Sequence, residues 1–218
     1  QICKRAKEAG ILTVIDAAHS PGQIPVDLQT LDADIVFGNC HKWMLNAKGS
    51  AFLYVKQGLQ PLIDPLIVSW GYHPTPETTT GSRFIDILQW TGTKDPTAAL
   101  TVPTAIQFMR DNHWDKVRKE CHDLLRRGIE QICDLVNMPP LYPLDSDLYC
   151  QMGIAPLPLS NLVALKNRLY DEYKIEVPLI QWQDKQFVRI SVQGYNSEED
   201  IDALAKALQV LLPQVVIE

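Results

Sequence analysis

The sequence predicts an α/β fold, and three observations indicate it. Helical and strand patterns alternate in the first part of the chain, as they do in parallel α/β domains. Two apolar runs, Ile11–Ile15 and Asp34–Phe37, are each followed by polar residues, as strands are at the ligand-binding edge of a sheet. Hydrophobic residues make up 46% of the chain, enough for the core of one domain and a smaller second one.

The first expected elements belong to the α/β domain. A helix is expected at Gln1–Ala9, and strands are expected near Leu12–Asp16, Ile35–Gly38 and Ala51–Val55. The chain that follows is interrupted by prolines at positions 61, 65, 74 and 76. Because proline breaks long helices, we expect this stretch up to Thr80 to be a loop region that lines the site.

The second half begins with helical spacing. Thr97–Arg110 has the pattern of a helix with a kink or a start at Pro103, and His113–Val136 is a long amphipathic helix that would join two domains. The break at Met138-Pro139-Pro140 suggests a hinge. We therefore divide the chain into residues 1–112 and 113–218.

The last expected elements form the smaller domain. They are a strand near Leu148–Met152, a helix at Ser160–Tyr173, strands at Glu176–Ile180 and Phe187–Val192, and a helix that begins at Ser197. Ser197 is a typical N-cap residue, and Asp200 stands at the capping-box position three residues later. The acidic residues of this first turn also favour the helix dipole.

Composition and charge exclude several classes of partner. The net charge is −6, which argues against the phosphate backbone of nucleic acids. No apolar run approaches the length of a membrane span, and the first residues do not resemble a signal peptide. We expect a cytoplasmic protein that binds neither nucleic acid nor membrane.

The cysteines predict neither disulfides nor a metal site. There are five of them, widely spaced and without a Cys-x-x-Cys pair, so we expect reduced thiols and no bound metal. Cys40 stands beside His41 and is a candidate nucleophile or ligand. Packing is the reading we favour for it.

The residues that follow the first two strands suit an aldehyde cofactor. A lysine amine forms a Schiff base with an aldehyde, and Lys42 is the candidate. A carboxylate that keeps a pyridine nitrogen protonated makes the ring an electron sink, and Asp16 is the candidate. His19 is placed to hydrogen-bond a phenolic oxygen, while Asn39 and His41 are placed to hold a phosphate. The cofactor with these groups is pyridoxal 5'-phosphate.

Each of these residues also has an ordinary structural reading. Asp16 can be a turn former, and most lysines are solvated surface charges. Trp43 and Trp90 are more readily packing residues than ring-stacking ones. Arg189 stands in an alternating strand and can pair with an acidic neighbour, Glu176 or Asp184.

Several motifs resemble the class V aminotransferase family of fold-type I pyridoxal phosphate enzymes, most closely its isopenicillin N epimerase-like branch. They are Asp16-Ala17-Ala18-His19 with Pro21-Gly22-Gln23, Gly38-Asn39-Cys40-His41-Lys42-Trp43, Lys48-Gly49-Ser50-Ala51-Phe52-Leu53, Gln89-Trp90-Thr91-Gly92-Thr93-Lys94-Asp95, and Val188-Arg189-Ile190-Ser191. The resemblance covers nearly the whole chain.

The resemblance implies an architecture and two further site residues. Residues 1–112 would be part of the large cofactor-binding α/β domain, and residues 113–218 the linking helix and the small α+β domain. Thr93 would reach the phosphate of the neighbouring subunit's cofactor, so a homodimer is expected. Arg189 would grip the substrate α-carboxylate. The family's phosphate-cradling turn and ring-stacking residue have no counterpart here, so we read the chain as the carboxy-terminal part of a longer enzyme, inactive alone.

The reaction that the resemblance implies begins at the Cα of an amino-acid substrate. Removal of the Cα proton by Lys42 can lead to epimerisation, to expulsion of a β-thiol by a C–S lyase acting on cysteine or cystine, or to transamination. Cysteine desulfurases carry a catalytic cysteine where this chain has Ile180-Gln181-Trp182-Gln183-Asp184, so the persulfide route is disfavoured.

Two other readings concern different classes of function. A non-catalytic remnant or dimerisation fragment is one alternative, although the retention of polar and ionisable residues at five separated positions, Asp16, His19, Lys42, Thr93 and Arg189, argues against it. A nicotinamide dehydrogenase is disfavoured, because no Gly-x-Gly-x-x-Gly follows a strand.

Overall fold

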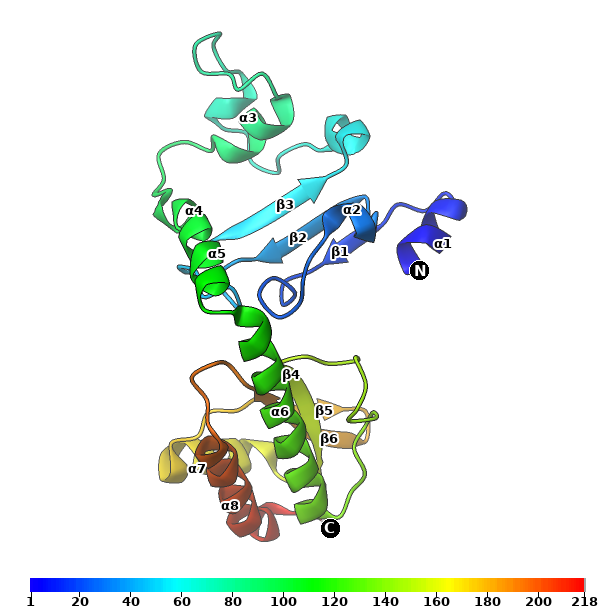
Figure 1. The fold of residues 1–218 in the computed structure, drawn as a ribbon, viewed down its shortest axis with the longest axis vertical. Helices are drawn as coiled ribbons and strands as arrows, with labels where there is room; N and C mark the ends of the chain where they lie inside the picture. The colour runs from blue at the N-terminus through cyan, green and yellow to red at the C-terminus, as the bar shows by residue number, and fades with distance from the viewer. Residues whose placement is uncertain (218) are drawn as a thin grey trace. The chain divides into compact units, whose positions relative to one another are not determined.

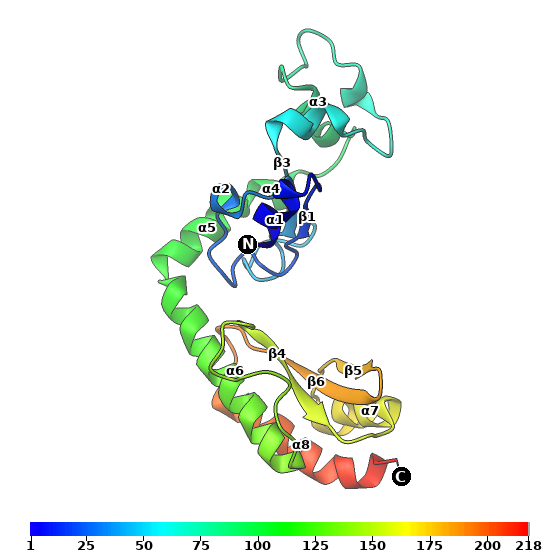
Figure 2. The same ribbon diagram turned by 90° about the vertical axis from the view of Figure 1, so that its right-hand side faces the viewer.

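The computed structural model describes residues 1–217, and the chain divides into two compact units (Figures 1 and 2). The units are Gln1–Asp111 and Asn112–Glu218, so the division falls one residue before the boundary expected from the sequence. Among the described residues, no helix has the combination of length and apolar character that crossing a membrane requires.

The amino-terminal unit contains a three-stranded mixed sheet. Its helices and strands are α1 (Ile2–Glu8), β1 (Val14–Asp16), α2 (Leu28–Leu31), β2 (Ile35–Asn39), β3 (Ala51–Val55), the 3-10 helices η1 (Gln57–Leu62) and η2 (Trp70–Tyr72), α3 (Arg83–Gln89), α4 (Thr97–Leu100) and α5 (Val102–Asp111). The sheet order is β1-β2-β3. β1 and β2 are parallel, while β3 is antiparallel to β2. The ends of β1 and β2 and the start of β3 therefore lie at one edge.

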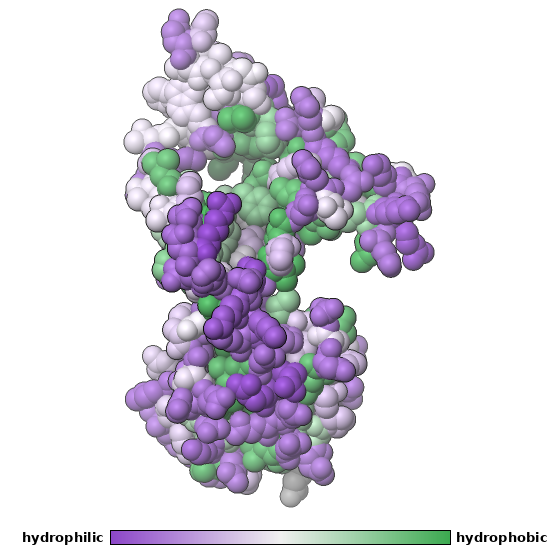
Figure 3. Space-filling model, viewed as in Figure 1, coloured by the Kyte–Doolittle hydropathy of each residue, from purple (hydrophilic) through white to green (hydrophobic). Residues whose placement is uncertain are grey.

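One face of this sheet carries the small core of the unit. Its buried members are Cys3, Ala17, Ala33 and Val36. The strand register places Asp16, Phe37 and Leu53 side by side, and all three are exposed. Val14 is exposed on the same face, since it lies two residues before Asp16. Figure 3 shows apolar residues in green at the surface of this unit. This open face leaves part of the sheet's apolar surface in contact with solvent.

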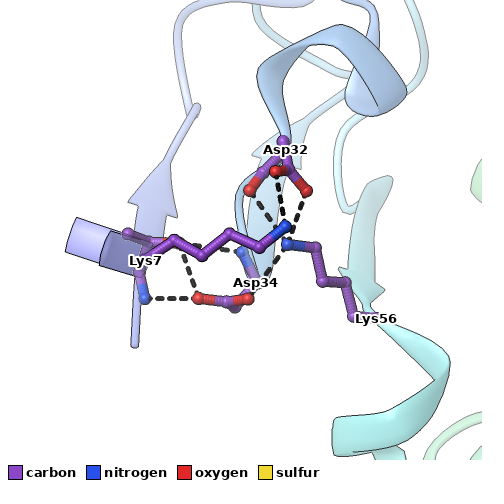
Figure 4. Close-up of polar contacts among 5 residues, drawn as sticks. Lys7, Asp32, Asp34 and Lys56 are labelled. Carbon is purple, nitrogen blue, oxygen red and sulfur yellow. Dashed lines mark hydrogen bonds and ion pairs between the residues drawn. The ribbon is translucent and has the colours of Figure 1, made fainter. Parts of the chain in front are cut away.

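An ion-pair cluster lies at the other end of the strands, opposite the loops that follow β1 and β2 (Figure 4). Lys56, directly after β3, lies 2.7 Å from a carboxylate oxygen of Asp32 and 3.1 Å from one of Asp34. Lys7 of α1 also pairs with Asp32, at 3.0 Å. Asp34 accepts hydrogen bonds from the backbone N–H and the hydroxyl of Thr13, both at 2.9 Å. The cluster links α1 to all three strands.

The segment between β3 and α4 is mostly irregular up to Thr80, as expected, apart from the 3-10 helices η1 and η2. Alongside η1 and η2 it contains α3, which begins after Ser82, whose hydroxyl accepts from the N–H of Ile85 at 3.4 Å. The buried carboxylate of Asp86 accepts from the hydroxyls of Thr79 and Thr80, both at 2.7 Å. These hydrogen bonds hold the segment on α3.

The carboxy-terminal unit packs three helices against an antiparallel sheet (Figure 2). Its elements are α6 (Trp114–Val136), β4 (Met152–Leu157), α7 (Leu162–Tyr173), β5 (Leu179–Trp182), β6 (Lys185–Ser191) and α8 (Glu198–Val215). The strand order is β4-β6-β5. Side chains of α6, α7, α8, β4 and β6 form one continuous core, in which Leu125, Leu165, Val188 and Leu208 are fully buried.

Most expected helices of this half are confirmed, and one strand is misplaced. Ser197 and Asp200 form the expected capping box at the start of α8. The strand expected near Leu148–Met152 is wrong, because β4 starts only at Met152 and runs through Pro156. Pro156 is tolerated there because β4 is an edge strand, whose outer side has no neighbouring strand that needs its N–H groups.

Candidate functional site

Asp16 ends β1 and begins the turn that carries His19. Its Oδ1 accepts a hydrogen bond from the N–H of Ala18 at 2.9 Å, which is the local pattern of an aspartate turn. The turn stays in register with β2, because the N–H of Ala17 donates to the carbonyl of Phe37 at 2.8 Å. The other oxygen of Asp16 has no hydrogen-bond partner among residues 1–217, and the side chain is exposed.

Lys42 and His19 meet although 23 residues separate them. The Nζ atom of Lys42 lies 3.3 Å from Nε2 of His19. The indole N–H of the buried Trp43 donates to Nδ1 of the same imidazole at 3.0 Å. The carbonyl of His19 accepts from the amide of Gln23 at 2.9 Å, so the backbone of this turn is also held. The loops after β1 and β2 therefore share one polar cluster.

A glycine allows these two loops to approach each other. Gly22 has a φ of +92°, and a Cβ atom there would lie 2.3 Å from the carbonyl oxygen of Trp43. Any other residue would separate the turn that carries His19 from the loop that carries Lys42. Gly38, one residue before the end of β2, is similarly covered by the ring of Phe52.

The loop between β2 and β3 is anchored at Ser50. The carbonyl of Ser50 accepts from the N–H of Cys40 at 3.0 Å and contacts Nδ1 of His41 at 2.9 Å. The amide of Asn46 donates to the hydroxyl of Ser50 at 2.7 Å and to the carbonyl of Ala98 at 2.8 Å. Sequence reasoning did not single out Ser50 or Asn46. In the sequence, only the Lys-Gly-Ser-Ala-Phe-Leu motif, which contains Ser50 and begins two residues after Asn46, pointed to them.

The expected phosphate-binding residues take no part in the cluster of Lys42, His19 and Trp43. Asn39 is the half-buried last residue of β2, and Thr93 lies exposed between α3 and α4. Among the described residues, neither Asn39, His41 nor Thr93 hydrogen-bonds to Lys42 or His19. Their side chains therefore keep hydrogen-bonding capacity for a ligand, apart from Nδ1 of His41.

Cys40 lies away from this polar cluster. Its side chain is buried, and burial raises the pKa of the thiol. A thiol held in its protonated form is a poor nucleophile and a poor metal ligand. The environment of Cys40 is therefore that of a packing residue.

Arg189 occupies the middle of β6 in the carboxy-terminal unit. Its backbone N–H donates to the carbonyl of Pro178 at 2.9 Å, while its Nε atom is buried without a hydrogen-bond partner. The alternative that it pairs with Glu176 or Asp184 is wrong, since no such ion pair exists among residues 1–217. Arg189 lines an open cavity of about 600 Å³ together with Glu176 and Asn196. A buried guanidinium nitrogen without a hydrogen-bond partner is costly, and a guanidinium group can form charge-assisted hydrogen bonds to a carboxylate.

Comparison with known proteins identifies relatives along the whole chain. The model of the family "Aminotransferase class-V" matches residues 1–144. The chain is 31% identical to an isopenicillin N epimerase of Amycolatopsis lactamdurans, over 97% of this chain and 55% of that protein. It is 26% identical to a hercynylcysteine sulfoxide lyase of Schizosaccharomyces pombe, over 96% of this chain and 54% of the relative.

Solved structures share the fold. A cysteine desulfurase from Thermococcus onnurineus NA1 superimposes with a TM-score of 0.80 at 20% identity, covering 98% of this chain and 55% of that structure. An alanine–glyoxylate aminotransferase from Nostoc sp. superimposes with a TM-score of 0.64 at 17% identity, covering 97% and 56%. The fold is therefore that of the fold-type I pyridoxal phosphate enzymes, as the sequence predicted.

The chain spans about half the length of the curated relatives that it matches. Within that span, the family model includes both loops that meet at His19 and Lys42 as well as Thr93, while Arg189 lies beyond it. The chain belongs to the class V aminotransferase family of pyridoxal phosphate-dependent enzymes.

Proposed function

We propose that this chain supplies the cofactor-binding lysine and the substrate-binding arginine of a pyridoxal phosphate enzyme that acts at the Cα or Cβ of an amino acid. The observation that carries the proposal is the contact between Lys42 and His19 at the edge where β1 and β2 end. An amine that is exposed to a ligand and paired with an imidazole is the group that an aldehyde cofactor needs.

The residues present fit pyridoxal phosphate at three points. Lys42 offers an amine for covalent attachment of the aldehyde. Asp16 offers a carboxylate oxygen without a protein partner, which suits a protonated ring nitrogen. The unpartnered Nε of Arg189 suits the carboxylate of an amino acid. When bound, the cofactor supplies the electron sink for the electrons left at the substrate Cα.

The proposed roles follow from the chemistry of each side chain. Asp16 holds the proton on the ring nitrogen, because a carboxylate next to that nitrogen favours its charged form. Lys42 takes the proton from Cα and can return it. Arg189 orients the substrate by its carboxylate. Asn39 and His41 bind the phosphate, and Thr93 reaches the phosphate in the neighbouring subunit of a homodimer.

The names of the relatives support two outcomes of this chemistry. Two curated relatives are isopenicillin N epimerases, each 31% identical to this chain. The second candidate function is C–S bond cleavage, since the sulfoxide lyase and two proteins named probable or putative L-cysteine desulfhydrase also match over nearly the whole chain. A persulfide on the chain's own cysteine is disfavoured, because residues 151–218 contain no cysteine.

The attachment of the cofactor can be tested by reduction. The full-length protein is incubated with pyridoxal phosphate, reduced with borohydride, and digested for mass spectrometry. We expect a phosphopyridoxyl group on Lys42, with the nearby exposed Lys48 unmodified, and no adduct in Lys42→Arg. Absence of the adduct in the wild-type protein would favour a non-catalytic remnant or a dimerisation role.

The two reaction outcomes are distinguished by products. A C–S lyase releases sulfide, pyruvate and ammonia from cysteine. It cleaves a C–S bond of cystine in the same way. An epimerase exchanges the Cα hydrogen with deuterium from solvent and converts one stereoisomer into the other without releasing ammonia. Transfer of the amino group to an added keto acid would identify a transaminase.

A further inference from the structure

His19 is held between two nitrogen atoms of different chemistry. On one side the indole nitrogen of Trp43 lies 3.0 Å from Nδ1, and on the other the amine nitrogen of Lys42 lies 3.3 Å from Nε2. Trp43 is 8% exposed, so water does not readily replace this indole contact. The indole contact restricts which nitrogen of His19 can carry a proton.

The indole fixes the first choice. A tryptophan N–H can only donate a hydrogen bond, so Nδ1 of His19 must accept and carries no proton. An imidazolium has protons on both nitrogens, and it is therefore incompatible with this contact. In a neutral imidazole the single proton then resides on Nε2.

The neighbouring histidine is held in the opposite way. Nδ1 of His41 faces the carbonyl of Ser50, which can only accept, so Nδ1 of His41 carries a proton. His122, in the carboxy-terminal unit, has the same arrangement with the carbonyl of Cys150 at 2.9 Å. His41 and His122 thus provide contrasts to His19 within one chain.

We infer that Trp43 is a positioning residue that locks His19 in the Nε2–H form, so that His19 presents a hydrogen-bond donor toward Lys42. The amine of Lys42 can accept that bond only through its lone pair, which belongs to the free base. The free base is the form that attacks an aldehyde. The assignment of the proton rests on the chain's own hydrogen bonds, while its consequence for cofactor capture rests on the proposed function.

The tautomer is measured directly by NMR. The full-length protein is labelled with 15N-histidine, without cofactor, and long-range 1H–15N correlations distinguish Nδ1–H from Nε2–H. Signals are assigned by loss in His19→Gln and His122→Gln. We expect the Nε2–H pattern for His19 and a protonated Nδ1 for His122. A protonated Nδ1 on His19 overturns the inference.

A pair of tryptophan variants tests the cause. Trp43→Phe keeps an aromatic ring but removes the donor, whereas Trp114→Phe removes an indole of nearly equal burial, 9% exposed, from the other unit. We expect Trp43→Phe to release His19 into a mixture of protonation forms and to slow the capture of pyridoxal phosphate by Lys42 roughly tenfold, the scale of one lost hydrogen bond. Trp114→Phe should change neither quantity.

The outcomes separate this inference from the proposed function. An unchanged His19 pattern in Trp43→Phe overturns the role of the indole, whatever the cofactor does. If the wild-type protein shows the Nε2–H pattern but never captures pyridoxal phosphate at Lys42, the proposed function fails and the tautomer assignment stands. If Trp43→Phe does not fold, the wild-type NMR pattern alone decides.

Discussion

Asp16 has an observed structural role in the turn after β1 and a proposed chemical role at the cofactor ring, and a single substitution separates the two. Asp16→Asn keeps the oxygen that accepts from Ala18 but removes the negative charge. We expect the full-length variant to retain bound cofactor while its turnover number falls at least about a hundredfold, because the ring nitrogen loses its anionic partner. Steady-state kinetics together with cofactor absorbance measure both quantities.

Asp27→Asn is a matched control for this change. Asp27 also accepts from backbone N–H groups, of Gln29 and Thr30, but it does so as the N-cap of α2. Its variant should keep normal turnover. Near-normal turnover in Asp16→Asn would remove Asp16 from the proposed site.

Arg189 gives a second prediction for a single side chain. If Arg189 binds the substrate carboxylate as proposed, Arg189→Ala should raise the Michaelis constant for the amino-acid substrate by the equivalent of about 2–5 kcal/mol, since a half-buried charged partner is lost. Arg168→Ala is the control, because Arg168 is engaged in an ion pair with Glu172 on α7. An unchanged Michaelis constant in Arg189→Ala would place the substrate carboxylate elsewhere.

Sequence motifs could single out Asp16, His19 and Lys42 as candidates because their residue types and spacing are visible in the sequence. The role of Trp43 could not be predicted in this way. An indole can pack or donate, and only the closeness of the two loops, which Gly22 permits, decides which it does. The same holds for Ser50, whose backbone carbonyl rather than its side chain contacts His41.

At the scale of elements, the turn after β1 depends on Gly22. Gly22→Ala places a methyl group against the backbone of Trp43, so we expect the free energy of unfolding to fall by roughly 1–3 kcal/mol or more. Chemical denaturation measures the change.

Gly49→Ala isolates the contribution of backbone strain to that loss. Gly49 has the same φ of +92°, but a Cβ there meets nothing within 4 Å. The difference between the two variants is therefore the cost of separating the two loops. Equal losses would show that the approach of Gly22 to Trp43 contributes nothing.

The ion-pair cluster predicts sensitivity to acid. The backbone hydrogen bond from Thr13, followed by the contact with Lys56, holds the pKa of Asp34 below its ordinary value. Because the folded pKa is the lower one, this stabilisation is complete above the ordinary aspartate pKa of about 3.9 and is lost as the pH falls through the folded value.

Asp34→Asn tests that dependence. The variant should be less stable at pH 7 by about 1–3 kcal/mol, the scale of an impaired buried hydrogen-bond site. It should also lose less stability than the wild type between pH 5 and pH 3, in unfolding experiments at about 0.1 M salt. A wild-type-like acid dependence would assign the effect to other carboxylates.

Sequence patterns predicted the elements well where burial is regular. The predicted limits of β3 agree with the structure, and the amphipathic pattern correctly predicted α6, since the apolar residues of this helix do face a core. Two elements were missed for physical reasons. β4 was misplaced because it runs through Pro156 as an edge strand, and α3 was not expected because it is held by hydrogen bonds from Thr79 and Thr80 to Asp86 that the sequence pattern does not show.

At the scale of the molecule, the two units differ in how complete their cores are. The carboxy-terminal unit buries a continuous core from helices and sheet, whereas the amino-terminal sheet has a small core and an open face. We expect residues 112–218, expressed alone, to unfold cooperatively on heating. Residues 1–111 alone should lack a cooperative transition, by circular dichroism and calorimetry. A cooperative transition of that fragment would mean that the small core suffices.

The two compact units meet at Asp111, where the pattern of the chain changes to that of the long helix. The open sheet face was not predictable. Val14, Phe37 and Leu53 are apolar like core residues, and only the strand register shows that they share a face without a covering element in the described chain.

The sheet order β1-β2-β3 leaves an outer edge on β1 and another on β3. Neither strand contains a lysine or a proline, the residues that usually prevent a free edge from recruiting another strand. Such edges are templates for intermolecular pairing. With both edges unpaired, this half of the molecule should be prone to aggregate, and a chaperone that shields β-edges would raise its yield.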